Sequence, residues 1–535
     1  MSTAPAPPAP TRRLAGWSLV AILLLALGVG LRLYRFPSVP AGLNQDEAAA
    51  GYEALSLLET GRDRWGNRLP PYFPAWGSGQ SVLLSYLTVP FVAVLDLSVL
   101  SVRLPSLALG LLTLVLFYAT VRRTGGQSQA LVAVTLLALS PWHVMLSRWA
   151  LDANLLPLTL LLGVFLLTRS FASESRTAHV VSLVPFALTF YSYALATLVT
   201  PLLVTLLLVL NRKAVARHWR RYLASAVIAI ALSAPFGLVV FKNQIVKREV
   251  GIERSLPFDL PLLPASRLEQ AHTRALRVNT EFLLSGLRDD LLWNSLPDVR
   301  PLPGLVLALA LLGLVTAVQE ARVRRSVDPF AVWLLAALPV LLAVPVNVTR
   351  ANAFYLPLVA LAARGVVALD AALSAHLRGT VRAVGLTVLL VATLHFARHY
   401  FGDLPRLGAQ AFNRNLDLAL TAAREAARPD ETLRITEAIP LNYAYYLFFN
   451  RVPPAEFQEK AVYTVVPGAG FDVQRLGTAV FRRDALELVP TGTTLHVVRA
   501  SEAPSCPEPE VVHQDKWWRV ERCPGPISAS ANAPR

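Results

Sequence analysis

Runs of about 20 consecutive apolar residues recur along most of the chain, and they constrain the fold more than any other feature. A transmembrane helix needs about 20 such residues to cross the hydrocarbon core of a bilayer. Of the 535 residues, 54% are hydrophobic and 16% are charged, whereas soluble globular proteins average about 25% charged residues. These proportions exclude a disordered protein, a coiled coil and an ordinary cytosolic enzyme. The sequence therefore predicts an all-α polytopic membrane protein.

Eleven of the apolar runs are interpreted as membrane spans. They cover residues 14–31, 102–121, 128–146, 155–170, 178–195, 197–211, 222–241, 303–319, 329–346, 353–370 and 383–400. A further run, 81–97, contains Ser81, Ser85 and Tyr86. These polar groups favour a juxtamembrane or re-entrant helix that lies against the bundle over a lipid-facing span.

The distribution of basic residues predicts the orientation, since cytoplasmic loops carry an excess of Lys and Arg. With Arg12 and Arg13 in the cytoplasm, the cytoplasmic loops hold Arg122/Arg123, Arg169/Arg176, Arg212/Lys213/Arg217/Arg220/Arg221, Arg322/Arg324/Arg325 and Arg378/Arg382. We therefore expect an inner-membrane protein with a cytoplasmic N-terminus and extracytoplasmic segments 34–101, 147–154, 242–302 and 401–535. A full span at 81–97 would place every one of these clusters outside.

Three regions are expected: a cytoplasmic tail at 1–13, a membrane domain at 14–400, and a small extracytoplasmic α/β domain at 401–535. The last region has strand-like runs at Thr432–Ile435 and Thr494–Val498. It also contains Cys506 and Cys523, the only cysteines of the chain. Two cysteines exclude a disulfide-rich scaffold and a Cys-based zinc site. They form either a disulfide, in an oxidising compartment, or two unpaired thiols.

Acidic residues stand at two places on the predicted external face. Asp46 and Glu47 are adjacent, at the start of a helix predicted over 48–58, and Asp152 follows the third span. Two carboxylates at one surface can serve as a general base and an acceptor-positioning group. Alternatively, the first pair complements a helix dipole and Asp152 is an ordinary helix N-cap.

Several arginines lie at external span ends, against the usual charge bias. They are Arg32, Arg35, Arg103, Arg148 and Arg350, and Lys242, Lys247 and Arg248 add to the external positive charge. Each alone is unremarkable, because Arg side chains snorkel to the interface. Together they suggest a phosphate-binding collar, because guanidinium groups bind phosphate in a bidentate way.

These motifs resemble those of the GT-C glycosyltransferases, in particular glycosyltransferase family 39, which includes protein O-mannosyltransferases and lipid A aminoarabinose transferases. The matching features are Asp46-Glu47, Thr60-Gly61-Arg62-Asp63 with Gly66 and Pro70, the run 101–106, Ser147-Arg148 with Asp152-Ala153-Asn154, the run 347–352, and the aromatic run 443–449. The similarity covers roughly residues 15–450 and is most specific in the first external loop.

The resemblance implies a glycosyltransferase that takes a monosaccharide from a polyprenyl-phosphate carrier at the external membrane face. The acceptor, whether glycan, lipid or protein, stays open, as does a requirement for a divalent cation. Asp46 corresponds to the catalytic carboxylate, Glu47 to its neighbour and Asp152 to the second-loop acid. The expected substrate-binding residues are Arg103, Arg148, Arg350, Asp63, Tyr72 and Asn347.

The remaining signals are weaker. His395 and His399 stand at a spacing that permits metal binding but is more typical of a structural pair. Asp289, Asp290, Trp293 and Asn294 form either an acceptor contact or a solvated loop. The net charge of +15 is interpreted as membrane orientation and contact with anionic lipid, because the chain has no nucleic-acid motif. A transporter or lipid flippase, or an inactive relative of the transferases, is the alternative.

Overall fold

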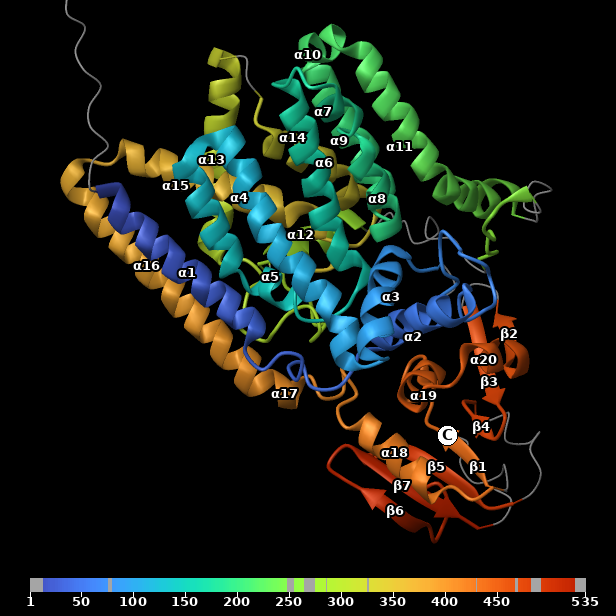
Figure 1. The fold of residues 1–535 in the computed structure, drawn as a ribbon. Coiled ribbons are helices and arrows are strands. Elements are labelled where there is room, and N and C mark those ends of the chain that lie inside the picture. Colours follow the sequence, from blue (N-terminus) through green and yellow to red (C-terminus); the bar gives the residue numbers. More distant parts are fainter. Residues whose placement is uncertain are drawn as a thin grey trace, which may run out of the picture.

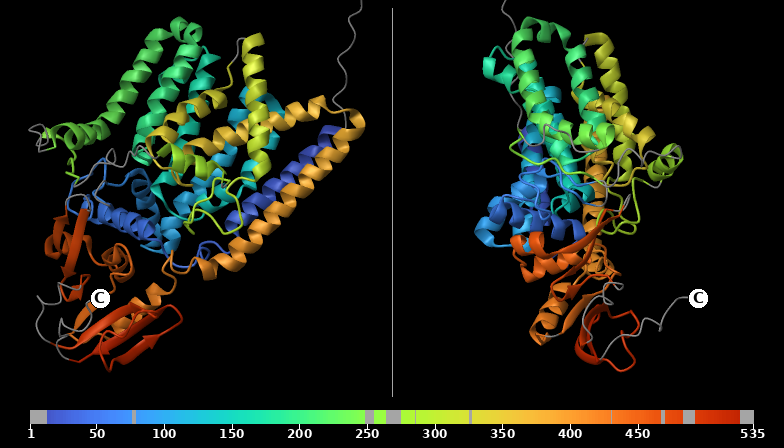
Figure 2. Two further views of the ribbon diagram at one scale, coloured as in Figure 1. Left: turned by 180° about the vertical axis from the view of Figure 1, so that it is seen from behind. Right: turned by 90° about the vertical axis from the view of Figure 1, so that its right-hand side faces the viewer.

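The computed structural model describes residues 13–75, 79–247, 255–263, 275–284, 286–324, 327–429, 431–466, 470–482 and 492–524. A helical bundle forms one part, and a sheet with a few helices lies at one end of it (Figure 1). Figure 2 shows the same arrangement from behind and from the side.

The bundle is built mainly from apolar helices. Its helices are α1 (Arg13–Leu33), α4 (Val99–Ala138), α5 (Pro141–Leu146), α6 (Leu156–Phe171), α7 (Arg176–Val180), α8 (Val184–Ser192), α9 (Ala196–Leu210), α10 (Arg212–Arg217), α11 (Trp219–Val240), α12 (Ala275–Leu284), α13 (Gly304–Arg324), α14 (Pro329–Ala343), α15 (Asn352–Ala372) and α16 (Ala375–Arg398). Among the described residues, six helices are long and apolar enough to cross a membrane, judged by length and composition. The prediction of a polytopic, mostly helical membrane protein is confirmed.

Three predicted spans differ from simple helices. Runs 102–121 and 128–146 meet in α4, which bends at Gly126, where φ is 86°, a value that glycine adopts without steric cost. Run 178–195 is broken instead of continuous. It contains only the short helices α7 and α8, separated by a turn in front of Pro185. A proline tends to start a helix because it lacks the N–H that a helix interior needs.

The external segment before α4 holds two helices, α2 (Gln45–Thr60) and α3 (Leu83–Leu95). At 1.5 Å per residue, the 13 residues of α3 extend about 20 Å, which is shorter than the ~30 Å hydrocarbon core. It lies close to α2 (Figure 1). The run 81–97 therefore forms a short helix beside α2, and its juxtamembrane or re-entrant placement stays a prediction.

The chain leaves α16 through a π-helical turn (His399–Asp403) and α17 (Leu404–Leu407) and then enters the sheet region. That region contains α18 (Leu416–Ala426), β1 (Thr432–Ile435), α19 (Asn442–Asn450), α20 (Pro454–Lys460), β2 (Val462–Val466), β3 (Gly470–Leu476), β4 (Ala479–Val480), β5 (Thr494–Arg499), β6 (Glu510–Gln514) and β7 (Trp518–Cys523). The strand order is β2-β3-β4-β1-β5-β7-β6, with β1 parallel to β4 and β5 and the other pairs antiparallel. Cys506 and Cys523 form a disulfide.

Two large clusters of buried hydrophobic side chains form the core of the protein. One cluster of buried side chains fills the bundle, and a second joins α2 and α3 to the sheet region. This second cluster contains Ala48 and Tyr52 of α2 together with Tyr445, Val497 and Trp518 of the sheet region. The first external segment is therefore packed directly onto the sheet region.

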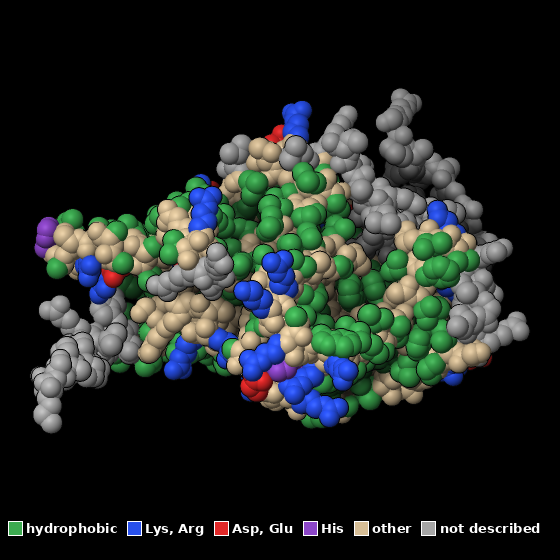
Figure 3. Space-filling view, turned by 90° about the horizontal axis from the view of Figure 1, so that it is seen from above, with side chains coloured by type: hydrophobic (Ala, Val, Ile, Leu, Met, Phe, Trp, Pro, Cys, Tyr) green, Lys and Arg blue, Asp and Glu red, His purple; other side chains and the backbone are tan. Residues whose placement is uncertain are grey.

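The loops with the predicted cytoplasmic Arg clusters lie at the end of the bundle opposite the sheet. That end includes α10 (Figure 1), and seen from above it shows many Lys and Arg side chains and few acids (Figure 3). Exposed members of this basic face are Arg122, Arg123, Arg169, Arg212, Lys213, Arg217 and Arg220. The charge is thus segregated along the bundle axis, as the positive-inside rule requires.

Cysteine labelling tests the orientation, and the disulfide leaves no other thiol to react. In sealed right-side-out vesicles, a membrane-impermeant maleimide should label Gln514→Cys in β6, and should label Arg123→Cys only after permeabilisation, since the basic face is expected to lie in the cytoplasm. If Arg123→Cys alone were labelled before permeabilisation, the orientation would be the reverse of the predicted one.

Candidate active site

The start of α2 is fixed by a capping box. Asn44 is the N-cap residue, and its Oδ1 accepts a hydrogen bond from the Asp46 N–H at 3.0 Å. In return, the Asn44 N–H donates to Glu47 Oε2 at 3.0 Å. Such reciprocal bonds satisfy N–H groups that a helix start leaves without partners. Asp46 and Glu47 are therefore held in the first turn of the helix.

Glu47 is fully occupied by protein partners. Its two oxygens accept from Arg103 Nε and Nη2, both at 2.8 Å, in a bidentate ion pair whose side chains are both 0% exposed. Oε1 also accepts from the N–H of Ala150 at 3.0 Å, in the second external loop. With the capping bond, each carboxylate oxygen has two donors. Glu47 thus joins α2, α4 and the second loop.

Arg103 has no N–H left for a substrate in this arrangement. Besides the two bonds to Glu47, it donates from Nη1 to the carbonyl oxygens of Pro37 and Pro40, and from Nη2 to that of Gly42. An arginine has five N–H donors, and all five are used. The geometry therefore supports a positioning role for Arg103, and it does not support the predicted contact to a lipid phosphate.

Arg148 and Arg32 have similar roles. The terminal nitrogens of Arg148 donate to the carbonyls of Leu31, Arg32, Tyr34 and Val39, at 2.6–2.9 Å. Arg32 bonds to Gly28, Ala138, His143 and Ser147. Both side chains are 0% exposed. These arginines clamp the end of α1 and the loop that follows it, so the predicted phosphate collar is not formed by these two side chains as they stand.

Asp152 lies at the start of a short 3₁₀ turn (Asp152–Leu155), beneath α3. Its Oδ2 accepts from the N–H of Ser81 at 3.1 Å and its Oδ1 from the N–H of Ala153 at 2.7 Å. Next to it, the hydroxyl of Ser81 and Oε1 of Gln80 are buried and make no hydrogen bond within the protein. A buried polar atom without a partner is costly. These two groups mark a polar site beside Asp152 that nothing in the sequence spacing revealed.

Asp46 faces the sheet region. Together with Glu47, it contributes to raising the pKa of Tyr445 in α19, although burial of the phenol is the larger cause. The Tyr445 hydroxyl accepts from Nδ2 of Asn413 at 2.6 Å. Just before α2, Gly42 has φ +95°, and a side chain there would collide with the carbonyl oxygen of Phe412. The half-buried Asp46 therefore sits between the membrane domain and the sheet region.

The third external segment is joined to the turn 347–352 before α15. Asp289 accepts from the N–H of Val348 at 2.8 Å, and Asn294 Oδ1 accepts from the Thr349 hydroxyl at 2.8 Å. Asn347 Oδ1 accepts from the Arg350 N–H at 2.8 Å, closing the turn before α15. The predicted groups at 289–294 and 347–352 thus lie together.

Asn352 makes the link to Asp152. Its amide donates to the carbonyl of Ala153 at 2.9 Å and accepts from the Trp142 indole at 2.8 Å. Arg350, whose Nη1 donates to Pro345, is therefore in the turn next to the second acidic loop. Asp290 is exposed, and Trp293 packs on the bundle core.

The other predicted residues lie farther out. Tyr72 is 4% exposed and packs edge-on against Phe236 of α11, at 5.8 Å between ring centroids. Buried Lys242 donates to the carbonyl of Leu260, and Arg35 donates to that of Phe401. Lys247 is exposed directly after the π-helical segment Phe241–Val246 that follows α11, and Arg248 lies outside the described residues. In the ranges that the structure describes, no three His, Cys, Asp or Glu side chains group to hold a metal ion.

Asp63 closes the turn after α2. Its carboxylate accepts from the N–H groups of Trp65 and Asn67 and from the Asn67 amide, at 2.8–2.9 Å. Burial, and secondly repulsion by Glu53, raise the pKa of Asp63 to about 8. Glu53 itself forms an ion pair with Arg64 at 3.2 Å, with both side chains 0% exposed. The carboxyl group of Asp63 therefore stabilises the loop after α2, and its bonding to that loop does not resemble a substrate contact.

The fold is similar to that of solved GT-C membrane glycosyltransferases. The sequence model of a family described as dolichyl-phosphate-mannose-protein mannosyltransferase matches residues 80–238. No curated protein matches the chain by sequence. The family match runs from α3 through most of α11, and it includes Asp152 and Arg103 but not Asp46.

The chain is similar in fold to two solved structures of ArnT from Cupriavidus metallidurans, among others. The form bound to undecaprenyl phosphate aligns with a TM-score of 0.58 and 13% identity, over 98% of this chain and 100% of that chain. The apo form aligns with a TM-score of 0.56 and 15% identity, over 95% and 98%. At this identity the match shows the fold, and it confirms the resemblance that the motifs indicated.

The ion pair of Glu47 and Arg103 should dominate the stability of the external loops. Glu47→Gln leaves a buried guanidinium without its counter-charge, which typically costs about 3–5 kcal/mol. The matched control is Glu281→Gln, which breaks an exposed pair with Arg277 in α12. We expect a clear loss of melting temperature for Glu47→Gln and almost none for the control; equal values would refute the anchoring role.

The raised pKa of Asp63 predicts a pH-dependent stability. The folded state keeps a proton that the unfolded chain releases near pH 4, and it keeps it up to about pH 8. The folded state therefore binds more protons in this window, and the free energy of unfolding falls as the pH rises through it. Asp63→Asn should flatten the melting temperature between pH 5 and 8 relative to wild type, while Glu59→Gln, on the exposed end of α2, should not. An unchanged slope in Asp63→Asn would show that the folded protein holds Asp63 ionised.

Proposed function

We propose that the protein is an integral membrane glycosyltransferase. It moves a monosaccharide from a polyprenyl-phosphate carrier to an acceptor at the extracytoplasmic face. The fold match, the family match over residues 80–238 and the motifs of the first loop support this function. One of the two ArnT structures has undecaprenyl phosphate bound, which supports a polyprenyl phosphate as the carrier here. The sugar and the acceptor stay open.

One observation carries the assignment of the catalytic base: the three candidate carboxylates have different surroundings. Glu47 has four donors and is fully buried. Asp152 accepts two backbone N–H bonds and is 6% exposed. Asp46 is half-buried and rigidly held by the capping box. We therefore assign Asp46 as the base that orients and deprotonates the acceptor, and Glu47 as its positioning residue.

The chemistry suits a single carboxylate. A sugar phosphate already carries a good leaving group, so little acid assistance is needed, whereas the acceptor hydroxyl or amine must be oriented and lose a proton. The bond from the sugar anomeric carbon to the phosphate oxygen breaks as the bond to the acceptor forms. The proton passes to Asp46, and the lipid phosphate leaves as an anion.

The departing phosphate needs a fixed cation. We assign this role to Arg350, because its turn is joined to the second acidic loop through Asn352. The unbonded Ser81 hydroxyl and Gln80 Oε1 beside Asp152 are placed to take hydrogen bonds from sugar hydroxyls. Arg103 and Arg148 then act by shaping the loop that carries these groups.

Asp46→Asn tests the function and the base together. The amide keeps the size of the side chain but cannot accept the proton, so turnover should fall at least ~100-fold, with the melting temperature near that of wild type. The measurement is transfer or release of label from radiolabelled undecaprenyl-phosphate monosaccharides by purified protein in proteoliposomes.

The matched control is Asp417→Asn, an exposed acid in the first turn of α18, which should keep full activity. Wild-type turnover in Asp46→Asn would refute the base assignment. Absence of turnover in the wild type with every polyprenyl-phosphate sugar tried would refute the proposed function and favour a transporter.

A further inference from the structure

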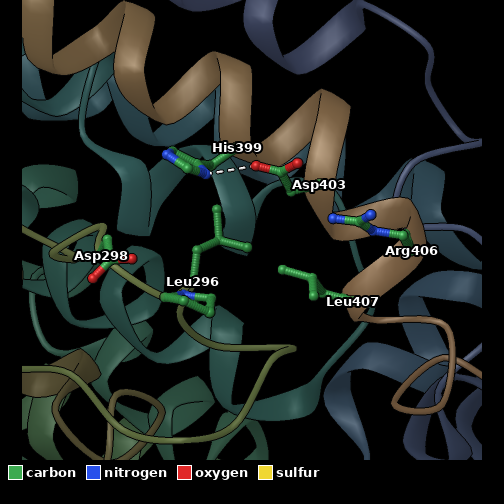
Figure 4. A pocket seen from close by; sticks show the side chains of 7 residues that line it. Leu296, Asp298, His399, Asp403, Arg406 and Leu407 are labelled. Atoms are coloured by element: carbon green, nitrogen blue, oxygen red, sulfur yellow. Dashed lines mark hydrogen bonds and ion pairs between the residues drawn. The ribbon is translucent and has the colours of Figure 1, made fainter.

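A cavity of about 180 Å³ lies where α16 ends. Its walls are formed by the π-helical turn and α17 on one side and by the loop 296–298 on the other (Figure 4). The lining residues are Leu296, Pro297, Asp298, His399, Asp403, Arg406 and Leu407. None of them belongs to the acids or arginines described above, so the cavity is a separate feature.

The charges around the cavity are mixed. His399 Nδ1 and Asp403 Oδ2 are 2.7 Å apart and form one wall (Figure 4). Asp298, whose side chain is 84% exposed, lies across the cavity, 4.0 Å from Arg288. Arg406 is exposed, and its guanidinium makes no hydrogen bond or ion pair with any described part of the chain. The carboxylates of Asp403 and Asp298, each paired on one side with a basic side chain, and the guanidinium of Arg406 thus surround a space large enough for a small polar group.

The surface of the protein beside the cavity indicates which kind of molecule can bind there. The surface of α16 beside it is apolar and open, with Leu390, Val391 and Leu394 exposed by 38%, 60% and 65%. This helix is one of those long and apolar enough to cross a membrane. A membrane-spanning helix presents such residues to acyl chains, so the polar cavity stands at the interfacial end of a lipid-facing surface. A molecule with an apolar tail and a polar head matches both surfaces.

We propose that this cavity binds the headgroup of a phospholipid that carries a primary ammonium, such as phosphatidylethanolamine. The phosphate pairs with Arg406, and the ammonium donates to the carboxylates of Asp403 and Asp298. Charge-assisted bonds of this kind are the strong ones. A purely anionic headgroup would meet two carboxylates, and a quaternary ammonium has no N–H to donate, so the site selects the primary amine. It is independent of the proposed transferase reaction.

Lipid binding to the full-length protein tests the site. Purified protein in detergent is titrated with phosphatidylethanolamine, phosphatidylglycerol or phosphatidylcholine of identical chains, and bound lipid is counted by native mass spectrometry. We expect the ethanolamine lipid to bind ~10-fold more tightly than the other two. Arg406→Gln and Asp298→Asn, both at exposed positions, should each remove most of this preference.

The matched control is Arg398→Gln, which removes an exposed arginine from the same end of α16 that does not line the cavity. It should bind as wild type does. Equal affinity for the three lipids, or an unchanged preference in Arg406→Gln, would overturn the proposal. As a last control, soluble glycerophosphoethanolamine is added as a competitor. If it competes at the same concentration as the lipid, the site recognises a free phosphoamine, and the lipid assignment is wrong.

Discussion

The buried ion pair between Glu47 and Arg103 is the interaction on which the external half of the molecule depends. It joins the start of α2 to α4, and through the Ala150 N–H it holds the second external loop. A buried ion pair is stable only when every charge is matched by good geometry and further hydrogen bonds. Here the carboxylate has four donors and the guanidinium five acceptor contacts, so this requirement is met. Asp46 is the neighbouring residue in the first turn of α2, so this ion pair also fixes the position of Asp46.

Buried arginines replace secondary structure in the loop after α1. Residues 34–43 have neither helix nor strand, yet their backbone carbonyls must be satisfied where they are buried. Arg103 and Arg148 supply N–H donors to the carbonyls of Tyr34, Pro37, Val39, Pro40 and Gly42. A guanidinium can reach several carbonyls at once because its donors form a rigid planar fork. These side-chain hydrogen bonds therefore take the place of the backbone hydrogen bonds that a helix or a sheet would supply to the loop.

Sequence reasoning found the architecture because it depends on averages over many residues. Apolar runs mark helices, and strand-like runs marked Thr432–Ile435 and Thr494–Val498, which the structure contains as β1 (Thr432–Ile435) and β5 (Thr494–Arg499). The Asn44-x-x-Glu47 spacing of a capping box could also have been recognised. The partners of Arg103 and Arg148 could not, because an arginine at a span end looks the same whether it meets a phosphate or a carbonyl. The unbonded Ser81 hydroxyl likewise depends on three-dimensional packing, as does the break in run 178–195.

The sheet region holds the helix that carries Asp46. Leu43 and Asn44, which precede the helix of Asp46, bond to the carbonyls of Phe412 and Ala411, and Gly42 allows the two segments to touch. Tyr52 of α2 donates to the carbonyl of Val452 at 3.0 Å, and the aromatic run at 443–449 packs into the same core. The end of α2 is held as well, since the Gln458 amide donates to the Asp63 carbonyl at 2.9 Å. Because both ends of α2 are bound to the sheet region while Glu47 binds α4 and the second external loop, the position of Asp46 is set by both parts of the chain together.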